Sequence, residues 1–383
     1  MKIEGAKWLQ AAQPIFELLE QAGYKALAVG GCVRNAIFEL PVADVDFATD
    51  AAPDVVMELA KKAGLKVVPT GIEHGTVTVV LDGVGYEITT FRKDVSSDGR
   101  RAVVAFSDNI EDDAKRRDFT MNALYLAASG QVIDPLGGLE DARARHLRFI
   151  ENAFERITED YLRILRYFRF YALYCDPMQG PDMQAIAAIS ANLDGLEGLS
   201  AERVGAEMRK LLAAPDPAPA LAMMMQTGVL RRILPGADAR FIAPLVEIEA
   251  GTPIRWLRRL AALGGQDVGA RWRLSKAEAR GLKDIESAMV MPSLAEAGYR
   301  LGEAAAMDAM LVQCASLGMP ADPALVAKIK AAGAAVFPLK AADLMPRIPP
   351  GPALGAELKR LEKCWIDSGF ALDKAALDKL VKA

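Results

Sequence analysis

The feature that most constrains this chain is a glycine pair, Gly30 and Gly31, followed shortly by two aspartates, Asp44 and Asp46, that flank a single valine. Apolar residues before the glycines predict a strand, those after them predict a helix, and the aspartates would lie in the next strand. Residues i and i+2 of a strand point to one face, which would place the two carboxylates side by side. Two carboxylates that close repel each other unless a cation lies between them. Mg²⁺ suits the position, because it takes one or two carboxylates and fills its other positions with water and phosphate.

The glycines indicate a second ligand. Glycine allows the backbone to approach a ligand closely, and the N-terminus of the following helix favours an anion. A metal ion and a phosphate at one place imply a nucleotidyl-transfer site. The alternative is that Asp44 and Asp46 are exposed loop acids, which is the ordinary situation of aspartate.

A third acid, Glu87, lies in a β-branched run, Tyr86 to Phe91, that predicts a strand. If that strand is adjacent to the aspartates, Glu87 completes an acidic triad. Two-metal phosphoryl chemistry needs about three carboxylates to hold ions roughly 3.5–4 Å apart. An exposed strand glutamate without such a role is an equal alternative.

Adjacent arginines, Arg116 and Arg117, precede Asp118 in the next charged pattern. Planar guanidinium groups could grip phosphates, and Asp118 could cap a helix and orient an arginine. The alternative is an ordinary charged helix start.

Four charged residues recur at intervals of three: Asp160, Arg163, Arg166 and Arg169. On a helix, residues i and i+3 are neighbours, so Asp160 and Arg163 could present an acceptor and a donor fork to one ligand. Edge hydrogen bonds of this kind are how side chains read bases. The helix would be anchored by an adjacent apolar ridge, Leu162, Leu165 and Phe168. The alternative is a solvated basic face with an i,i+3 salt bridge.

The secondary-structure pattern changes at about residue 140. Residues 1–140 show alternating strand and helix signals, including a helix that begins at Pro53. Strands are predicted over Thr76–Leu81 and Tyr86–Phe91, with Asp82-Gly83 as a hairpin signal in a loop longer than two residues. Residues 92–102, with six charges of mixed sign, predict a mobile loop. After residue 140 strand signals almost vanish, and proline clusters divide a helical remainder.

The composition of the chain limits the expected cellular location of the protein and the kinds of partner it could bind. The formal net charge of −4 does not by itself indicate nucleic acid, so RNA contacts would need local basic clusters such as Arg255, Arg258 and Arg259. Four cysteines without metal or disulfide spacing fit a reducing cytosol. No uncharged run of about 18 apolar residues is present. We therefore expect a soluble, cytoplasmic protein with no membrane partner.

Together, these motifs resemble the class II tRNA nucleotidyltransferase and bacterial poly(A) polymerase family, closely from Ala28 to about Phe170 and loosely beyond. The resemblance implies an α+β fold, with a polymerase-β-type nucleotidyltransferase head followed by an all-helical neck, body and tail. The expected parts are a catalytic head over 1–140, a neck with a base-recognition helix over 141–214, a body over 215–335 and a tRNA-binding tail over 336–383.

The resemblance also implies roles for single residues. Asp44 and Asp46 would hold catalytic Mg²⁺, with Glu87 as the third catalytic acid. Asp160 and Arg163 would template C and then A through their Watson–Crick edges. The residues expected to contact the nucleotide are Gly31, Arg34, Arg117, Asp160, Arg163, Arg166 and Arg169.

The resemblance extends to two further segments and shows one departure from the family pattern. Asp98 to Arg101 resembles part of the loop associated with switching from C to A addition. The stretch from Ser200 to Lys210 resembles the neck motif. Asn35 stands where the family often has Asp, which would weaken an ion pair that fixes Arg34.

The implied activity is the addition of C, C and A to the 3′ end of tRNA from CTP and ATP, without a nucleic-acid template and with release of pyrophosphate. The body and tail would grip the acceptor arm of tRNA by shape and phosphate. The alternatives are a poly(A) polymerase, a partial enzyme that adds only CC or only A, a non-catalytic RNA-binding protein and a small-molecule nucleotidyltransferase. Retention of both aspartates argues against the non-catalytic protein, and the long helical extension argues against the small-molecule enzyme.

Overall fold

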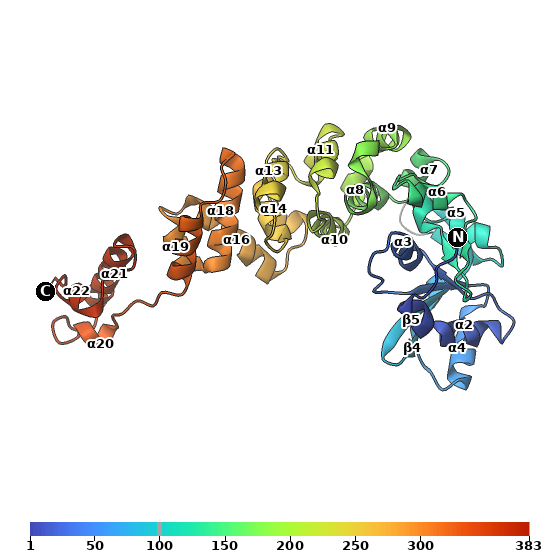
Figure 1. The fold of residues 1–383 in the computed structure, drawn as a ribbon, viewed down its shortest axis with the longest axis horizontal. Helices are drawn as coiled ribbons and strands as arrows, with labels where there is room; N and C mark the ends of the chain where they lie inside the picture. Colours follow the sequence, from blue (N-terminus) through green and yellow to red (C-terminus); the bar gives the residue numbers. More distant parts are fainter. Residues whose placement is uncertain (98–101, 383) are drawn as a thin grey trace. The chain divides into compact units, whose positions relative to one another are not determined.

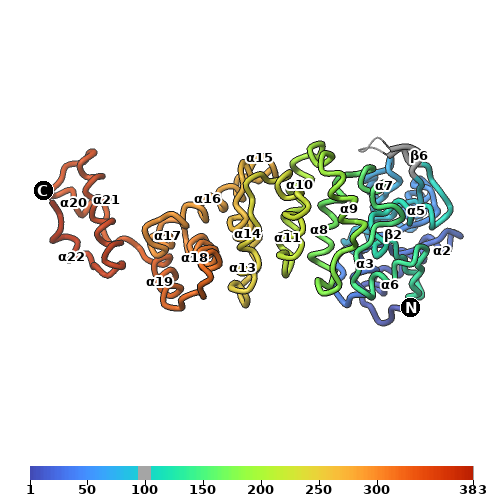
Figure 2. Tube along the Cα trace, turned by 90° about the horizontal axis from the view of Figure 1, so that it is seen from above, coloured from blue at the N-terminus to red at the C-terminus, as the bar shows by residue number. Residues whose placement is uncertain are grey.

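A computed structural model of the chain describes residues 1–97 and 102–382. The chain forms two compact units (Figures 1 and 2). Unit 1 comprises residues 1–214 and 219–233, and unit 2 comprises residues 215–218 and 234–383.

Within the described residues, a seven-stranded mixed sheet forms the base of unit 1, in the order β3-β4-β5-β2-β1-β8-β9. Its strands are β1 Leu27–Val29, β2 Asp46–Thr49, β3 Lys66–Gly71, β4 Thr76–Leu81, β5 Val84–Thr90, β8 Tyr125–Leu126 and β9 Val132–Ile133. Neighbouring strands are antiparallel except β2 and β5, which run parallel. The parallel pair matters because it joins the two strands that carry the predicted acids.

Helices pack against both faces of this sheet: Phe16 lies against Phe47 on one face, and Ala114 packs with Leu27 and Ala48 on the other. The helical elements of the sheet region are α1 Lys7–Ala11, α2 Gln13–Glu20, α3 Gly31–Ile37, α4 Pro53–Lys62, η1 Ile72–His74, α5 Ile110–Lys115, η2 Thr120–Asn122 and α6 Gly138–Arg143. Phe16 of α2 packs edge-on against Phe47 of β2, with ring centroids 4.8 Å apart, and Phe47 also meets Tyr86 of β5. Because side chains alternate along a strand, the residues next to Phe47 and Tyr86 point to the opposite face. Those residues include Asp46 and Glu87.

The hairpin between β4 and β5 is tighter than the sequence suggested. Leu81 pairs with Val84, so the loop contains only two residues, and the prediction of a longer loop is wrong. Asp82 and Gly83 have φ of 51° and 81°, the positive values that a type I′ turn requires. Gly85 therefore lies within the strand and not in the loop.

The predicted mobile loop over residues 92–102 is also wrong for its described part. β6 (Arg92–Ser97) pairs with β7 (Ala102–Phe106) as a two-stranded ribbon. A run of mixed charges does not reveal a strand whose pairing partner lies further along the chain. Residues 98–101, which resemble part of the switching loop, lie outside the described residues.

The rest of unit 1 is helical. Its elements are α7 Ala153–Glu159, α8 Leu162–Tyr174, η3 Pro177–Gln179, α9 Met183–Ala191, η4 Leu193–Gly198, α10 Ala201–Leu212, α11 Ala218–Gln226 and α12 Val229–Ile233. The predicted apolar ridge is buried, with Leu165 and Phe168 fully inaccessible. Burial of this ridge holds α8 in place, and the arginines of α8 line the cavity of unit 1.

Unit 2 consists of helices within the described residues. They are α13 Ile242–Ile248, α14 Trp256–Leu263, α15 Val268–Arg271, α16 Lys276–Val290, α17 Leu294–Leu301, α18 Glu303–Leu317, α19 Pro323–Gly333, α20 Ala341–Leu344, α21 Pro352–Asp367 and α22 Lys374–Asp378. The last three helices have an apolar cluster of their own around Leu361 and Trp365. No described helix is long and apolar enough to cross a membrane.

Two arginines of unit 2 are not available to RNA. Arg258 and Arg259 are 3% and 1% exposed, and both donate to Glu249, at 2.6 and 2.7 Å. Arg255 is more exposed and lies 3.2 Å from the carboxylate of Asp308. The prediction that Arg258 and Arg259 form an RNA-binding cluster is therefore wrong, because their guanidinium groups are used inside the unit.

Candidate active site

Three carboxylates lie at the exposed edge of β2 and β5. Asp46 opens β2 and pairs in register with Glu87 of β5, and both side chains are exposed. Asp44 precedes the strand, so only one of the two aspartates lies in a strand as predicted. Val45 is buried between them, so the alternation still places both carboxylates on the exposed side.

Electrostatics show that the acids lie close enough to interact. The walls around Asp46 partly desolvate its carboxylate and raise its pKa, nearby Glu87 and Asp44 raise the pKa further, and Arg117 opposes them. Within the described residues no group of three or more His, Cys, Asp or Glu forms a complete metal cage. A hard divalent cation needs only one or two carboxylates when substrate phosphates supply other oxygens. The carboxylate of Asp46, with those of Asp44 and Glu87 near it, offers the kind of oxygen donor that such an ion prefers.

The glycine turn places Arg34 beside these acids. Gly30 has φ of 74°, and a Cβ there would lie 3.3 Å from Nη1 of Arg117, so a side chain at this position would crowd the site. Arg34 lies on α3 and is buried. Its Nη1 donates to Asn122 at 2.6 Å, and its Nη2 donates to Asn35 Oδ1 and to the Tyr174 hydroxyl, both at 2.8 Å. Asn35 thus contacts Arg34 through a hydrogen bond to a neutral acceptor, in place of the ion pair that Asp would form at this position.

Asp118 orients an arginine, as one of the two sequence interpretations proposed. Its carboxylate accepts from Arg166 Nε at 2.7 Å, from Asn122 Nδ2 at 2.9 Å and from the backbone N–H of Phe119 at 2.9 Å. Burial alone would raise the pKa of Asp118, but Arg166 and Asn122 outweigh it and hold the pKa below the usual range. The preceding residue, Arg117, donates to Asp113 at 2.8 Å.

The predicted continuous helix around Asp160 is interrupted. Asp160 has extended backbone angles and lies between α7 and α8, because its Oδ1 accepts from the N–H of Leu162 and starts a new helix. Its other oxygen accepts from Arg203 Nη2 at 2.6 Å. Arg163 donates instead to Glu159, at 2.5 Å. The side chains of Asp160 and Arg163 therefore have different partners, although the backbone N–H of Arg163 donates to the carbonyl of Asp160 at 3.0 Å.

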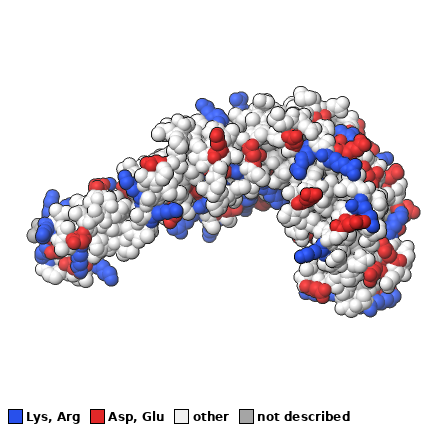
Figure 3. Space-filling view, in the orientation of Figure 1, with Lys and Arg blue, Asp and Glu red and all other residues white. Residues whose placement is uncertain are grey.

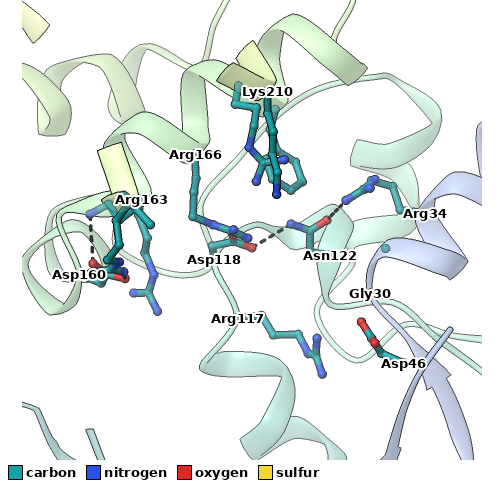
Figure 4. A pocket seen from close by; sticks show the side chains of 15 residues that line it. Gly30, Arg34, Asp46, Arg117, Asp118, Asn122, Asp160, Arg163, Arg166 and Lys210 are labelled. Carbon is teal, nitrogen blue, oxygen red and sulfur yellow. Dashed lines mark hydrogen bonds and ion pairs between the residues drawn. The ribbon is translucent and has the colours of Figure 1, made fainter. Parts of the chain in front are cut away.

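One cavity of about 650 Å³ brings most of the predicted residues together (Figure 4). Its lining consists of Gly30, Gly31, Arg34, Asp46, Arg117, Asp118, Asn122, Asp160, Leu162, Arg163, Arg166, Arg169, Phe170, Arg203 and Lys210. Figure 4 shows Arg34, Asp46 and Arg117 on one side and Asp160 with Arg163 on the other. A second cavity of about 320 Å³ shares Asp46 and Arg117 with the first and includes Glu87. The first cavity thus joins one carboxylate of the acidic edge, Asp46, with several guanidinium groups and the predicted base-reading pair.

Comparison with known proteins decides the family. The family described as "Poly A polymerase head domain" matches residues 26–148, and the one described as "Probable RNA and SrmB-binding site of polymerase A" matches residues 182–241. The CCA-adding enzyme of Streptococcus sanguinis is 34% identical over 390 aligned residues, which cover 96% of this chain and 96% of that protein. The chain belongs to the class II tRNA nucleotidyltransferase and bacterial poly(A) polymerase family.

Other members of this tRNA nucleotidyltransferase family are similar over nearly the whole chain. The mouse protein named "CCA tRNA nucleotidyltransferase 1, mitochondrial" is 30% identical, over 97% of this chain and 90% of its own length. A solved structure of the Bacillus stearothermophilus CCA-adding enzyme, in complex with CTP, is 30% identical, covers 95% of this chain and 94% of its own, and superposes with a TM-score of 0.76. The polymerase-β-type head with a helical remainder is therefore confirmed, and nucleotidyltransferases of this family generally use a divalent metal.

Three residues that line or support this cavity were not predicted as site residues from the sequence. Arg203 and Lys210 were recognised only as parts of a neck motif, yet both line the cavity. Arg156, which contacts the backbone of Arg116 and Arg117, was not singled out at all. No spacing in the sequence signals these contacts, because each joins segments that are far apart along the chain.

Proposed function

We propose that this protein is a CCA-adding enzyme of the cytoplasm, which extends the 3′ end of tRNA with C, C and A from CTP and ATP in a Mg²⁺-dependent reaction. The observation that carries the proposal is the single cavity that holds Asp46, the phosphate-binding arginines and the pair Asp160 and Arg163. The names of relatives that match along most of their length support it. We keep the division into head, neck, body and tail as part of the proposal.

In this reaction the 3′-oxygen of the RNA bonds to the α-phosphorus of the nucleotide, and the bond from that phosphorus to the bridging oxygen breaks to release pyrophosphate. A divalent cation, when bound, neutralises phosphate charge and lowers the pKa of the attacking hydroxyl. Asp44, Asp46 and Glu87 would hold it. Arg34 and Arg117 would bind the phosphates, since guanidinium groups match phosphate oxygens.

Base selection would fall to Asp160 and Arg163. The Asp160 carboxylate can accept from the N4 amino group of cytosine or the N6 amino group of adenine while it still binds Arg203, because its two oxygens offer about four lone-pair sites. Arg163 would donate to the neighbouring ring nitrogen. We propose Arg166 and Arg169 as further nucleotide contacts on the same helix.

The test uses tRNA transcripts that end at the discriminator base, in -C and in -CC. Each is incubated with Mg²⁺, CTP and ATP, and the 3′ ends are sequenced. Completion of all three to CCA followed by arrest is the expected result. Long A tails would indicate a poly(A) polymerase, a stop at CC or action only on -CC would indicate a partial enzyme, and no addition to bound tRNA would indicate a non-catalytic protein.

The same assay with a chelator tests whether the reaction requires a divalent metal ion. Addition should stop in excess EDTA and return when Mg²⁺ is restored. Activity that persists in EDTA would remove the metal role from Asp44 and Asp46.

A further inference from the structure

Arg156 grips the segment that carries the predicted phosphate-binding arginine, although it does not line the cavity itself. It lies on α7 and is 6% exposed. Its Nη2 donates to the backbone carbonyl of Arg116 at 2.5 Å and to that of Arg117 at 2.7 Å. One buried guanidinium group therefore fixes two successive peptide units, and the second belongs to Arg117.

The same side chain reaches the predicted base reader. The carboxylate of Glu159 accepts from Nη1 of Arg156 and from Nη1 of Arg163. Arg163 also donates to the backbone carbonyls of Arg156, at 2.7 Å, and of Arg116, at 3.2 Å. These contacts form a closed ring, in which Arg156 touches the phosphate segment on one side and, through Glu159, Arg163 on the other.

We propose that Arg156 is a positioning residue that couples the choice of base to the placement of the triphosphate; this inference rests on the proposed function. In the structure Arg163 is bound to Glu159 and to the carbonyl of Arg116, and in this proposal it exchanges these partners for the base. Arg156 remains on both of those groups and keeps them paired during the exchange. Without it, a partly buried carboxylate and a carbonyl would lose their donors whenever Arg163 turned to the base, which is costly.

The coupling follows from geometry. Arg163 and Arg117 lie on the same cavity (Figure 4), and two sets of contacts join them: Arg163 donates directly to the carbonyl of Arg116, and Arg156 donates to the carbonyls of both Arg116 and Arg117. A base that fits Arg163 therefore holds the triphosphate in register with Arg117, whereas a base that does not fit leaves it misplaced. A misplacement of about 1 Å costs on the order of 10²-fold in rate. Arg156 should thus affect correct nucleotides more than incorrect ones.

The experiment compares Arg156→Gln and Arg156→Lys with the wild type on tRNA that ends at the discriminator base. The measured quantity is the ratio of kcat/KM for CTP to that for UTP. We expect the ratio to fall about tenfold or more in Arg156→Gln, a free-energy difference of about 1.4 kcal/mol. Lysine keeps the charge and can still donate to a carbonyl, so Arg156→Lys should recover part of the ratio.

The matched control is Arg258→Lys in unit 2, since Arg258 is a buried arginine that pairs with Glu249 and Asp308 and has no contact with the cavity. It should lower the melting temperature without changing the ratio. An equal loss for CTP and UTP in the Arg156 variants would mark a merely structural brace and overturn the inference, as would an unchanged ratio. If Arg156→Gln does not fold, Arg156→Lys carries the same comparison.

A binding measurement separates this inference from the proposed function. Dissociation constants for CTP and UTP are measured with Mg²⁺ and without tRNA. Failure of the wild type to extend any tRNA would overturn the proposed function. The role of Arg156 alone would be overturned by a different pair of results. In that case the wild type completes CCA and prefers CTP to UTP, and Arg156→Lys shows the same binding preference and the same kcat/KM ratio.

Discussion

At the scale of single residues, the cavity holds its arginines in place with carboxylates before any nucleotide arrives. Six arginines line it, and five of them have a carboxylate partner. The pairs are Arg117–Asp113, Arg163–Glu159, Arg166–Asp118, Arg169–Glu207 and Arg203–Asp160. Arg34 instead donates to the neutral oxygens of Asn122, Asn35 and Tyr174, so we expect its charge to be available to an anionic ligand. Groups fixed in advance bind developing charge without the cost of reorganisation.

The first prediction at this scale concerns Asp46. Asp46→Asn should reduce incorporation by about 10³-fold or more, because a lost metal ligand removes several kcal/mol of transition-state stabilisation. The dissociation constant for tRNA should stay nearly the same. Single-turnover incorporation and tRNA binding are measured on the same preparation, and retained turnover would exclude Asp46 from the metal site.

Asp46→Asn should also raise the melting temperature of the metal-free protein. The pKa of Asp46 is raised in the folded state, so ionisation at neutral pH opposes folding, and this cost is relieved as pH falls through the folded pKa. The amide carries no charge and removes the cost, so the difference between wild type and variant should shrink at acidic pH. Melting curves in EDTA at two pH values check the sign, and a lower melting temperature for the variant at neutral pH would contradict it.

A third residue-level prediction separates base reading from phosphate binding. Asp160→Ala should impair selection among the four nucleotides, because it removes the acceptor for the amino groups of C and A. Arg34→Lys should instead raise KM for CTP and ATP together, since it weakens a phosphate contact common to both. The measurement is kcat and KM for each nucleotide. Unchanged selectivity in Asp160→Ala would refute the templating role.

At the scale of elements, the sequence predicted those structures whose cause is local. β4 has the predicted bounds, Thr76–Leu81, and α4 begins at Pro53, where proline fits the first turn of a helix. The acids of β2 and β5 were predicted as possible neighbours, and the strand pairing supplies the register. Three features could not be predicted, because each depends on a distant partner: the β6–β7 ribbon, the break at Asp160 and the burial of Arg258 and Arg259.

One element-scale prediction tests how η4 supports that break. A Cβ on Gly195 would lie 2.0 Å from the ring of Tyr161, the residue after Asp160. Gly195→Ala should therefore displace Tyr161, destabilise the protein by about 1–3 kcal/mol through overpacking and reduce nucleotide selectivity. Gly198→Ala is the matched control in the same short helix, because a Cβ there would meet nothing within 4 Å. Equal melting temperatures for the two variants would contradict the prediction.

At the scale of the whole molecule, positively and negatively charged side chains are mixed on the visible surface of the described residues and do not form one large patch of a single sign there (Figure 3). Figure 3 shows basic and acidic side chains interspersed on the face drawn, in keeping with the formal net charge of −4. If the chain binds tRNA as proposed, binding would depend on local groups, and on salt through the phosphates they contact. Each unit also has buried groups of its own, with the ionic cavity in unit 1 and the ion pairs of Glu249 in unit 2. We therefore expect damage to one unit to leave nucleotide binding in the other unchanged.

Glu249→Gln tests this independence. Glu249 is 3% exposed and accepts from Arg258 and Arg259, so an amide there would leave two buried cations short of an acceptor. Breaking a buried ion pair costs about 3–5 kcal/mol, which should lower the unfolding transition of unit 2. Glu247→Gln, at an exposed site on α13, should change stability by less than about 0.5 kcal/mol. CTP should bind both variants with the dissociation constant of the wild type, because the cavity residues all belong to unit 1. Weaker CTP binding in Glu249→Gln alone would show that unit 2 supports the nucleotide site.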